Sequence, residues 1–174
     1  GSPTGPIPGP NYRYHRGPQP KIQALLKRGQ EVVVQVTKAS QGGKGPGLST
    51  FVSLPGRYMV LTPNSDRGGV SRKIEDGGAR NELRKMLDRL PVPEGMGVIV
   101  RTAAINRSFE DLQRDLNYLV RVWSVISERI HDSEAPALLY TDSDPAIRTV
   151  RDYFTADTTE IVVDDKDVYE RVLA

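Results

Sequence analysis

The apolar residues in the first hundred positions occur in short runs that alternate with polar residues, which is typical of β-strands. Over Glu31–Lys38 the β-branched residues Val32, Val34 and Val36 share one face of an extended chain. Proline and glycine separate the runs and mark turns. The pattern further predicts strands at Leu48–Leu54, Tyr58–Leu61 and Gly97–Thr102, a helical turn over Lys21–Arg28, and a helix from about Asn81 to Leu90.

A spacing of three and four residues replaces this alternation after residue 107. Ser108 has the character of an N-cap, and Asp111 three residues later completes a weaker form of the capping box. The apolar positions that follow predict a long amphipathic helix ending near His131, with Trp123 in its buried stripe: Leu112, Leu116, Leu119, Val120, Ile126 and Ile130.

The last forty residues alternate between the two periods. They predict a strand at Ala137–Tyr140, a helix at Asp144–Phe154, a strand at Thr159–Val163 and a helix after Asp164. Alternating strands and helices indicate an α/β arrangement in which adjacent strands are parallel. Together with the first half, the pattern predicts an α/β chain, α+β overall, with a long amphipathic helix.

The composition excludes several classes of chemistry. The chain has 174 residues with no cysteine and two histidines, so disulfides, thiolate nucleophiles, cysteine-ligated zinc and a histidine-rich metal site are ruled out. No apolar run is long enough to span a bilayer, and no charged-then-apolar leader opens the chain. We therefore expect a cytoplasmic protein without a membrane segment.

Charge is distributed unevenly along the chain. Residues 1–102 contain 16 Lys and Arg against 7 Asp and Glu, a balance of +9, and residues 103–174 contain 8 against 15, a balance of −7, which sum to the net +2. A basic half favours an anionic partner, nucleic acid above all, but a solvated basic surface accounts for the charge equally well. The leader Gly1–Pro20 is rich in proline and glycine and is expected to be extended or disordered, with Gly1 and Ser2 a cloning scar.

No convincing catalytic centre is encoded. The chain has neither a glycine-rich phosphate loop ending in Gly-Lys-Ser/Thr nor a Gly-x-Ser-x-Gly elbow. Asp164, Asp165 and Asp167 follow a predicted strand, where a metal site could form, but such a cluster more often caps a helix. We therefore expect capping here, and no catalytic or metal-binding residue.

Three basic segments stand at positions suited to phosphate. Lys44 lies in a glycine-rich loop between strands, Arg72 follows a turn, and Arg101 and Thr102 end a strand, where α/β sheets commonly place ligand groups. The Arg fork and the Thr hydroxyl suit a terminal phosphate. A structural ion pair between Arg101 and a carboxylate of the acidic half is the alternative.

Four blocks of the chain, in order and at fitting spacing, resemble the bacterial ribonuclease E/G family: Gly43-Lys44-Gly45, Leu48–Tyr58, Gly69–Ile74 and Glu94–Ala103. Leu112–Leu116 and Trp123 continue the match. In that family an OB-type RNA-binding barrel is inserted in an RNase H-like fold and followed by a 5′-sensor subdomain, which prefers RNA with a 5′-monophosphate. The resemblance implies that the chain holds the end of the OB-type domain (residues 21–54), the 5′-sensor (residues 55–145) and the start of the RNase H-like segment (residues 146–174).

The resemblance also implies roles for individual residues. Arg101 and Thr102 would grip the 5′-monophosphate, Gly56 and the backbone of Val60 would hold the terminal nucleotide, Arg72 would add a basic contact, and Lys44 would lie on the OB surface. Gly56, which lacks a side chain, would let a ribose or base approach closely. Phe51 could face RNA, but we expect it in the core.

The expected function is therefore an RNA-binding, regulatory fragment of an endoribonuclease, with single-stranded RNA as partner. The OB barrel should be incomplete, and cleavage should be absent. Magnesium and the catalytic carboxylates would belong to a further subdomain of the parent chain, itself expected to be a homo-oligomer. The alternative is a structural or protein-interaction module, in which Lys166–Leu173 and the leader dock onto the missing subdomains or a partner subunit.

Overall fold

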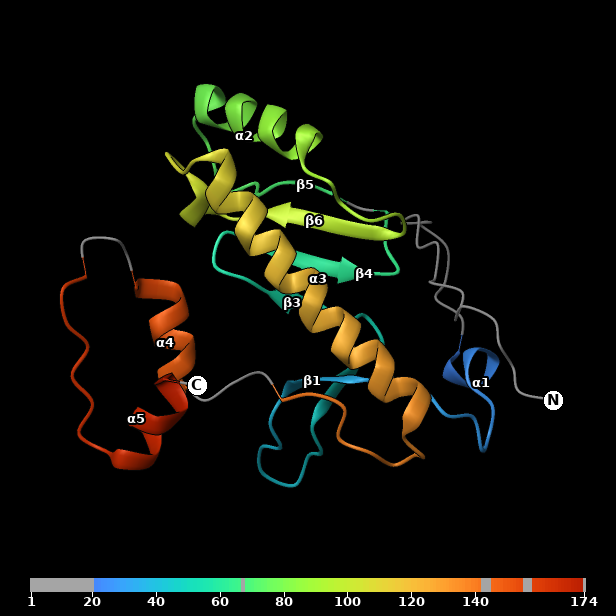
Figure 1. Cartoon of the computed structure of the whole chain (residues 1–174). Coiled ribbons are helices and arrows are strands. Elements are labelled where there is room, and N and C mark those ends of the chain that lie inside the picture. The colour runs from blue at the N-terminus through green and yellow to red at the C-terminus, as the bar shows by residue number, and fades with distance from the viewer. Residues whose placement is uncertain (1–20, 67, 142–144, 155–157, 174) are drawn as a thin grey trace.

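The computed structural model describes residues 21–66, 68–141, 145–154 and 158–173, so the leader, with its predicted extended form, lies outside the described residues. Helices and strands are both present, which confirms the mixed α+β class (Figure 1). The elements are α1 (Ile22–Leu25), β1 (Gln35–Lys38), β2 (Gly47–Ser49), β3 (Leu54–Pro55), β4 (Met59–Pro63), β5 (Gly69–Val70), α2 (Gly77–Arg89), β6 (Met96–Val100), the 3-10 turn η1 (Thr102–Ala104), α3 (Phe109–Asp132), α4 (Pro145–Tyr153) and α5 (Lys166–Leu173).

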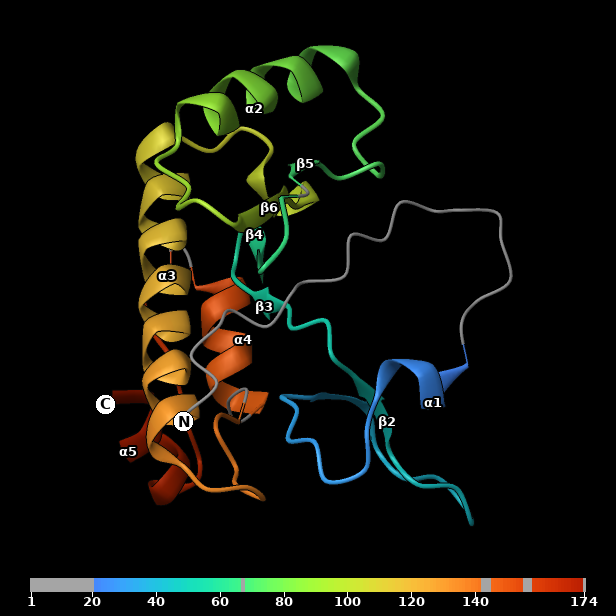
Figure 2. The same ribbon diagram turned by 90° about the vertical axis from the view of Figure 1, so that its right-hand side faces the viewer.

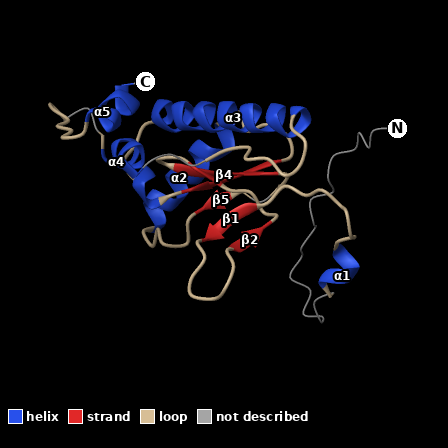
Figure 3. Ribbon diagram, turned by 90° about the horizontal axis from the view of Figure 1, so that it is seen from below, coloured by secondary structure: helices blue, strands red, loops and turns tan. Residues whose placement is uncertain are grey.

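A four-stranded sheet in the order β3-β4-β6-β5 forms the centre of the molecule. Strand β4 pairs antiparallel with β3 and with β6, in a register that places Met59 opposite Val100 and Pro63 opposite Met96. Strand β5 runs parallel to β6. Figure 3 shows α3 along one side of the strands, and the packing is therefore one helical layer over a sheet.

The core forms where the buried face of strand β4 packs against the apolar stripe of helix α3. Met59 and Leu61 of β4 are completely buried, while Val60 and Thr62 between them are half-buried on the other face. Helix α3 buries Leu112, Leu116, Leu119 and Ile126 against this sheet, and Trp123 packs at the edge of the cluster, as the stripe predicted. Each fully buried side chain of this size contributes about 1.5–3 kcal/mol, so this layer holds the sheet and α3 together.

Side-chain caps fix where the two long helices begin. The Ser108 hydroxyl accepts a hydrogen bond from the Asp111 N–H (3.2 Å), and the Asp111 carboxylate accepts one from the Ser108 N–H (3.3 Å), which confirms the predicted capping box. Helix α2 begins at Gly77, four residues before the predicted start, because the Asp76 carboxylate accepts a hydrogen bond from the Ala79 N–H. Gly77 and Gly78 have low helix propensity and concealed this first turn.

The segment 21–54 forms less structure than its pattern predicts. Strands β1 and β2 pair only with each other, and the predicted strand Leu48–Leu54 is divided between β2 and β3. Val36 and Phe51 are 61% and 55% exposed, so the prediction that Phe51 is a core residue is wrong. No second layer covers this hairpin in the described part of the chain, and no barrel forms there. Its assignment to an OB-type domain stays a prediction.

The strands predicted at Ala137–Tyr140 and Thr159–Val163 are absent. Both segments are described, and neither takes part in a ladder. A strand forms only where a neighbouring strand accepts its hydrogen bonds, and these two segments have no such neighbour. Among the described strands, the parallel pair is β5–β6, which lies outside residues 137–163. The prediction of adjacent parallel strands in the last forty residues is therefore wrong. The helices predicted around them are confirmed as α4 and α5.

Candidate functional site

Five of the six predicted site residues come together at one end of the central sheet. The Arg101 N–H donates to the Tyr58 carbonyl (2.8 Å), which places the end of β6 beside the β3–β4 turn that holds Gly56. On the other side of β6, the Ser71 N–H donates to the Val100 carbonyl (2.8 Å) and brings the following Arg72 to the same end. Four separate stretches of sequence thus contribute to one site: Gly56, Val60, Arg72, and Arg101 with Thr102.

Arg101 reaches across the end of the sheet toward the turn. Its Nη1 donates to the Gly56 carbonyl (2.5 Å) and to the Arg57 carbonyl (3.4 Å). No carboxylate among the described residues forms an ion pair with it, so the alternative of a structural ion pair is not what the structure shows. Arg101 is half-buried, and within the described part of the chain its Nε and Nη2 donate no hydrogen bond.

Thr102 and Arg72 supply the exposed part of the site. Thr102 opens the 3-10 turn η1 directly after Arg101. Arg72 lies in the exposed loop between β5 and α2, and Arg80 of α2 holds that loop. Arg80 Nη1 donates to the Ser71 and Ile74 carbonyls (both 3.1 Å), and its Nη2 donates to the Val70 carbonyl (3.3 Å). The loop that carries Arg72 is therefore fixed by the guanidinium of Arg80.

Val60 lies inside the sheet, with Pro55 opposite it on β3 and Ile99 opposite it on β6. Its backbone is flanked by strands on both sides, whereas its half-buried side chain faces away from α3. Ile99 is on the same face by alternation and is 41% exposed. Beside Arg101 the sheet therefore presents a small apolar surface made by Val60 and Ile99.

Lys44 is separate from this group. It lies in the tight loop between β1 and β2, where the Gln41 and Lys44 backbones exchange two hydrogen bonds (3.2 and 3.3 Å). Figure 2 shows the β1–β2 hairpin at the opposite end of the molecule from α2 and β5. The structure thus does not bring Lys44 to the other five residues.

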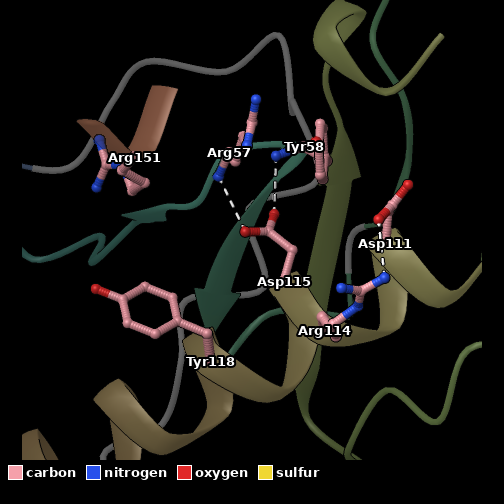
Figure 4. A pocket seen from close by; sticks show the side chains of 7 residues that line it. All are labelled: Arg57, Tyr58, Asp111, Arg114, Asp115, Tyr118 and Arg151. Carbon is pink, nitrogen blue, oxygen red and sulfur yellow. Dashed lines mark hydrogen bonds and ion pairs between the residues drawn. The ribbon is translucent and has the colours of Figure 1, made fainter. Parts of the chain in front are cut away.

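Asp115 of α3 is a part of the site that the sequence did not reveal. Its carboxylate accepts hydrogen bonds from three successive backbone N–H groups, those of Arg57 (3.0 Å), Tyr58 (2.8 Å) and Met59 (3.0 Å). Figure 4 shows it rising from α3 into the turn. The one available signal was an acidic residue directly before Leu116, at the border of the buried stripe of α3.

The carboxylate also explains why residue 56 is glycine. A Cβ atom at Gly56 would lie 2.6 and 2.7 Å from the two Asp115 oxygens, which is far inside normal contact distance. Gly56 is buried, its N–H donates to the Met59 carbonyl (2.8 Å), and its carbonyl accepts from Arg101. The close approach that requires glycine is thus made by Asp115 within the chain.

Arg151 of α4 completes this side of the turn. Its Nη1 donates to the Pro55 carbonyl (3.0 Å), and its Nε pairs with Asp152 (3.2 Å). A shallow pocket of about 300 Å³ separates it from α3, lined by Arg57, Tyr58, Asp111, Arg114, Asp115, Tyr118 and Arg151 (Figure 4). Burial raises the pKa of the Asp115 carboxyl above its usual range, and the three N–H donors and the Arg151 charge oppose that rise only in part.

Acidic residues elsewhere play structural roles. The Asp165 carboxylate accepts a hydrogen bond from the Val168 N–H (2.9 Å) at the start of α5, so the expectation that this cluster caps a helix is confirmed. Among the described residues, no three His, Cys, Asp or Glu side chains are grouped closely enough to share a metal ion. None of the described helices is long and apolar enough to cross a membrane.

Comparison with known proteins agrees with the resemblance seen in the motifs. Residues 53–174 match the model of the ribonuclease E/G family. The chain is 46% identical to ribonuclease E of Haemophilus influenzae over 154 residues, which is 88% of the chain and 16% of that protein. It is 45% identical to ribonuclease E of Escherichia coli over 161 residues, 92% of the chain and 15% of that protein, and 37% identical to ribonuclease G of Escherichia coli over 152 residues, 87% of the chain and 31% of that protein. The chain thus spans about a sixth of the ribonuclease E sequences, and it belongs to the ribonuclease E/G family.

Proposed function

We propose that this chain is an RNA-recognition part of a ribonuclease E/G-type endoribonuclease, and that it binds the 5′-monophosphate end of single-stranded RNA. Arg101 and Thr102 hold the phosphate, Arg72 adds a positive charge, and Gly56 and the backbone of Val60 hold the terminal nucleotide. Lys44 belongs to a separate surface that contacts RNA further along the strand. Cleavage is assigned to other parts of the enzyme.

The observation that carries this proposal is the convergence of Arg101, Thr102 and Arg72 at one end of the sheet. Arg101 directly follows β6, η1 begins at Thr102, and Arg80 holds the β5–α2 loop. A guanidinium, a hydroxyl and a second guanidinium supply donors for the terminal oxygens of a phosphate dianion. The apolar surface of Val60 and Ile99 lies next to Arg101, where the base or ribose attached to that phosphate would lie.

Fluorescence anisotropy with a single-stranded RNA labelled at its 3′ end tests the proposal. The same oligonucleotide is compared with a 5′-phosphate and with a 5′-hydroxyl. We expect the phosphorylated RNA to bind more tightly, by about tenfold or more, since charge-assisted hydrogen bonds contribute about 1.5–3 kcal/mol each. Arg101→Ala should abolish the preference, and Arg101→Lys should restore only part of it because it keeps the charge without the planar fork.

Arg121→Ala is the matched control. It removes the same charge from an exposed position on α3 and should leave the preference unchanged. Equal affinity of the wild-type chain for the two RNAs would contradict the proposal, and so would an Arg101→Ala variant that keeps the preference.

One observation favours the second candidate function, a structural or protein-interaction module without independent RNA binding. Leu138 and Val162 are 82% and 81% exposed in extended segments without strand partners, and Leu173 of α5 is 67% exposed. Such side chains suit contact with another domain or chain. The anisotropy experiment separates the two functions, because this candidate predicts no difference between the two RNAs.

A further inference from the structure

Three successive backbone N–H groups in the β3–β4 turn converge on one carboxylate. The donors belong to Arg57, Tyr58 and Met59, and the acceptor is Asp115, which lies 56–58 residues later in the chain. Consecutive N–H groups that point into one concavity form an anion-binding arrangement of the backbone. Here a side chain of α3 occupies that arrangement and makes it part of the fold.

The opposite side of the same turn is held by Arg101. Its Nη1 contacts the Gly56 and Arg57 carbonyls, and its N–H contacts the Tyr58 carbonyl. An anion therefore fixes the N–H groups of the turn while a cation fixes its carbonyls. Because the guanidinium takes its direction from the Gly56 carbonyl, any rotation of the turn would re-aim Arg101.

Helix α4 adds a third attachment immediately before the turn. Arg151 donates to the Pro55 carbonyl, and its positive charge lies close enough to Asp115 to favour the ionised carboxylate. The other charged side chains around the pocket are Arg57, Arg114 and Asp111, and Arg114 is already paired with Asp111 (3.2 Å). Asp115 is thus bound to the backbone of the turn rather than to a side-chain partner.

We propose that Asp115 is a positioning residue for 5′-end recognition: its carboxylate holds the turn at residues 56–59 in the one conformation that aims the Arg101 guanidinium at the terminal phosphate. This inference rests on the proposed function and assigns to Asp115 no contact with RNA. It implies that loss of the carboxylate weakens recognition of the 5′-phosphate while leaving the contacts made by the rest of the strand intact.

The test uses Asp115→Asn, with Glu128→Gln as control. The asparagine keeps the shape of the side chain but replaces one acceptor oxygen with an amide that cannot accept a hydrogen bond. Glu128 lies on the same helix at an exposed position, so its substitution removes the same charge without touching the turn. Two quantities are measured: amide hydrogen exchange at Arg57, Tyr58 and Met59, and affinity for RNA with a 5′-phosphate or a 5′-hydroxyl.

For Asp115→Asn we expect exchange at these three amides to be at least about tenfold faster, which corresponds to one hydrogen bond to a charged group. The preference for the 5′-phosphate should fall about fivefold or more, while affinity for the 5′-hydroxyl RNA stays unchanged. Glu128→Gln should behave as the wild type in both measurements. A merely structural role would lower the affinity for both RNAs together.

The outcomes separate this inference from the proposed function. Faster exchange with an unchanged 5′-phosphate preference overturns the positioning role and leaves the proposed function standing. Unchanged exchange overturns it as well, because the turn would then not depend on Asp115. A wild-type chain that does not distinguish the two RNAs overturns the proposed function and, with it, the purpose assigned to Asp115. If Asp115→Asn does not fold, Asp115→Glu is used instead, because it keeps the charge but moves the carboxylate by one methylene. A reduced preference of this variant for the 5′-phosphate RNA supports the inference, and an unchanged preference overturns it.

Discussion

Gly56→Ala is the substitution whose effect the structure defines most sharply. Its Cβ would meet both Asp115 oxygens at 2.6–2.7 Å and the carboxyl carbon at 2.9 Å. The φ angle of Gly56 is outside the left-handed region, so alanine could adopt the backbone conformation without strain. The whole effect should therefore come from displacement of the Asp115 carboxylate.

The cost follows from the hydrogen bonds that the carboxylate would lose. Moving it away from residue 56 stretches bonds of 2.8–3.0 Å to the Arg57, Tyr58 and Met59 N–H groups. Losing one or two hydrogen bonds to a charged acceptor lowers the free energy of unfolding by about 2–4 kcal/mol. In an Asp115→Ala background the space is already empty, so Gly56→Ala should cost less than about 0.5 kcal/mol and could stabilise by reducing the entropy of the unfolded chain.

A double-mutant cycle measures the difference. Urea unfolding is followed by circular dichroism and tryptophan fluorescence for the wild type, the two single variants and the double variant. We expect a coupling free energy of at least about 1.5 kcal/mol between positions 56 and 115. Additive effects of the two substitutions would refute the account of why residue 56 is glycine.

Three further predictions concern Asp115, the core and the β5–α2 loop. Burial raises the folded-state pKa of Asp115 above its unfolded value, so the folded protein retains the proton to a higher pH. The wild type should therefore gain stability relative to Asp115→Asn as the pH falls from 7 toward 4. Urea unfolding of both proteins at several pH values measures this, and a wild type that loses stability relative to the variant over that range would contradict it. Leu116→Ala, in a side chain that is 1% exposed between α3 and the sheet, should lower the free energy of unfolding by about 2–5 kcal/mol in the same experiment, and a loss below about 1 kcal/mol would mean that α3 does not pack as described. Arg80→Met removes the donors that hold the Val70, Ser71 and Ile74 carbonyls; it should speed amide exchange in residues 70–74 and weaken 5′-phosphate binding less than Arg101→Ala does, whereas an equal loss of binding would place Arg80 itself at the phosphate.

The sequence predicted correctly those elements that are stabilised by residues close together in the chain. The Ser108–Asp111 capping box and the apolar stripe of α3 are written within one helix, and both are confirmed. The alternation in β4 and the apolar run of β6 likewise identified the central strands. Elements that satisfy their own backbone hydrogen bonds, or whose buried face has one clear period, are readable from the sequence alone.

Strand pairing was the part that the sequence did not determine. Ala137–Tyr140 and Thr159–Val163 have the composition of strands, but a strand exists only where a second edge accepts its hydrogen bonds. Phe51 has the composition of a core residue, yet the β1–β2 hairpin has no covering layer in the described part of the chain. These errors share one cause, because each depended on what lies next to the segment in space.

In the candidate site too, residues marked by local motifs were predicted, and contacts between distant parts of the chain were not. Arg101, Thr102 and Arg72 were identified from position and from the motifs of the family, and the structure brings them together. Asp115 was missed because its partners are backbone N–H groups 56–58 residues away, and no side-chain pattern records them. Gly56 was singled out as a position where a ribose or base would approach closely, whereas the group that lies against it in this chain is the Asp115 carboxylate.

If Arg101 binds the 5′-phosphate of RNA, the arginine side-chain region of a ¹H–¹⁵N NMR spectrum should report the contact. The chain is titrated with one short single-stranded RNA carrying either a 5′-phosphate or a 5′-hydroxyl, and the Arg101 Nε–H signal is followed. We predict a large change in that signal, saturating with the phosphorylated RNA and absent or much smaller with the hydroxyl form. Identical changes with the two RNAs, or no change with either, would show that Arg101 does not recognise the 5′-phosphate.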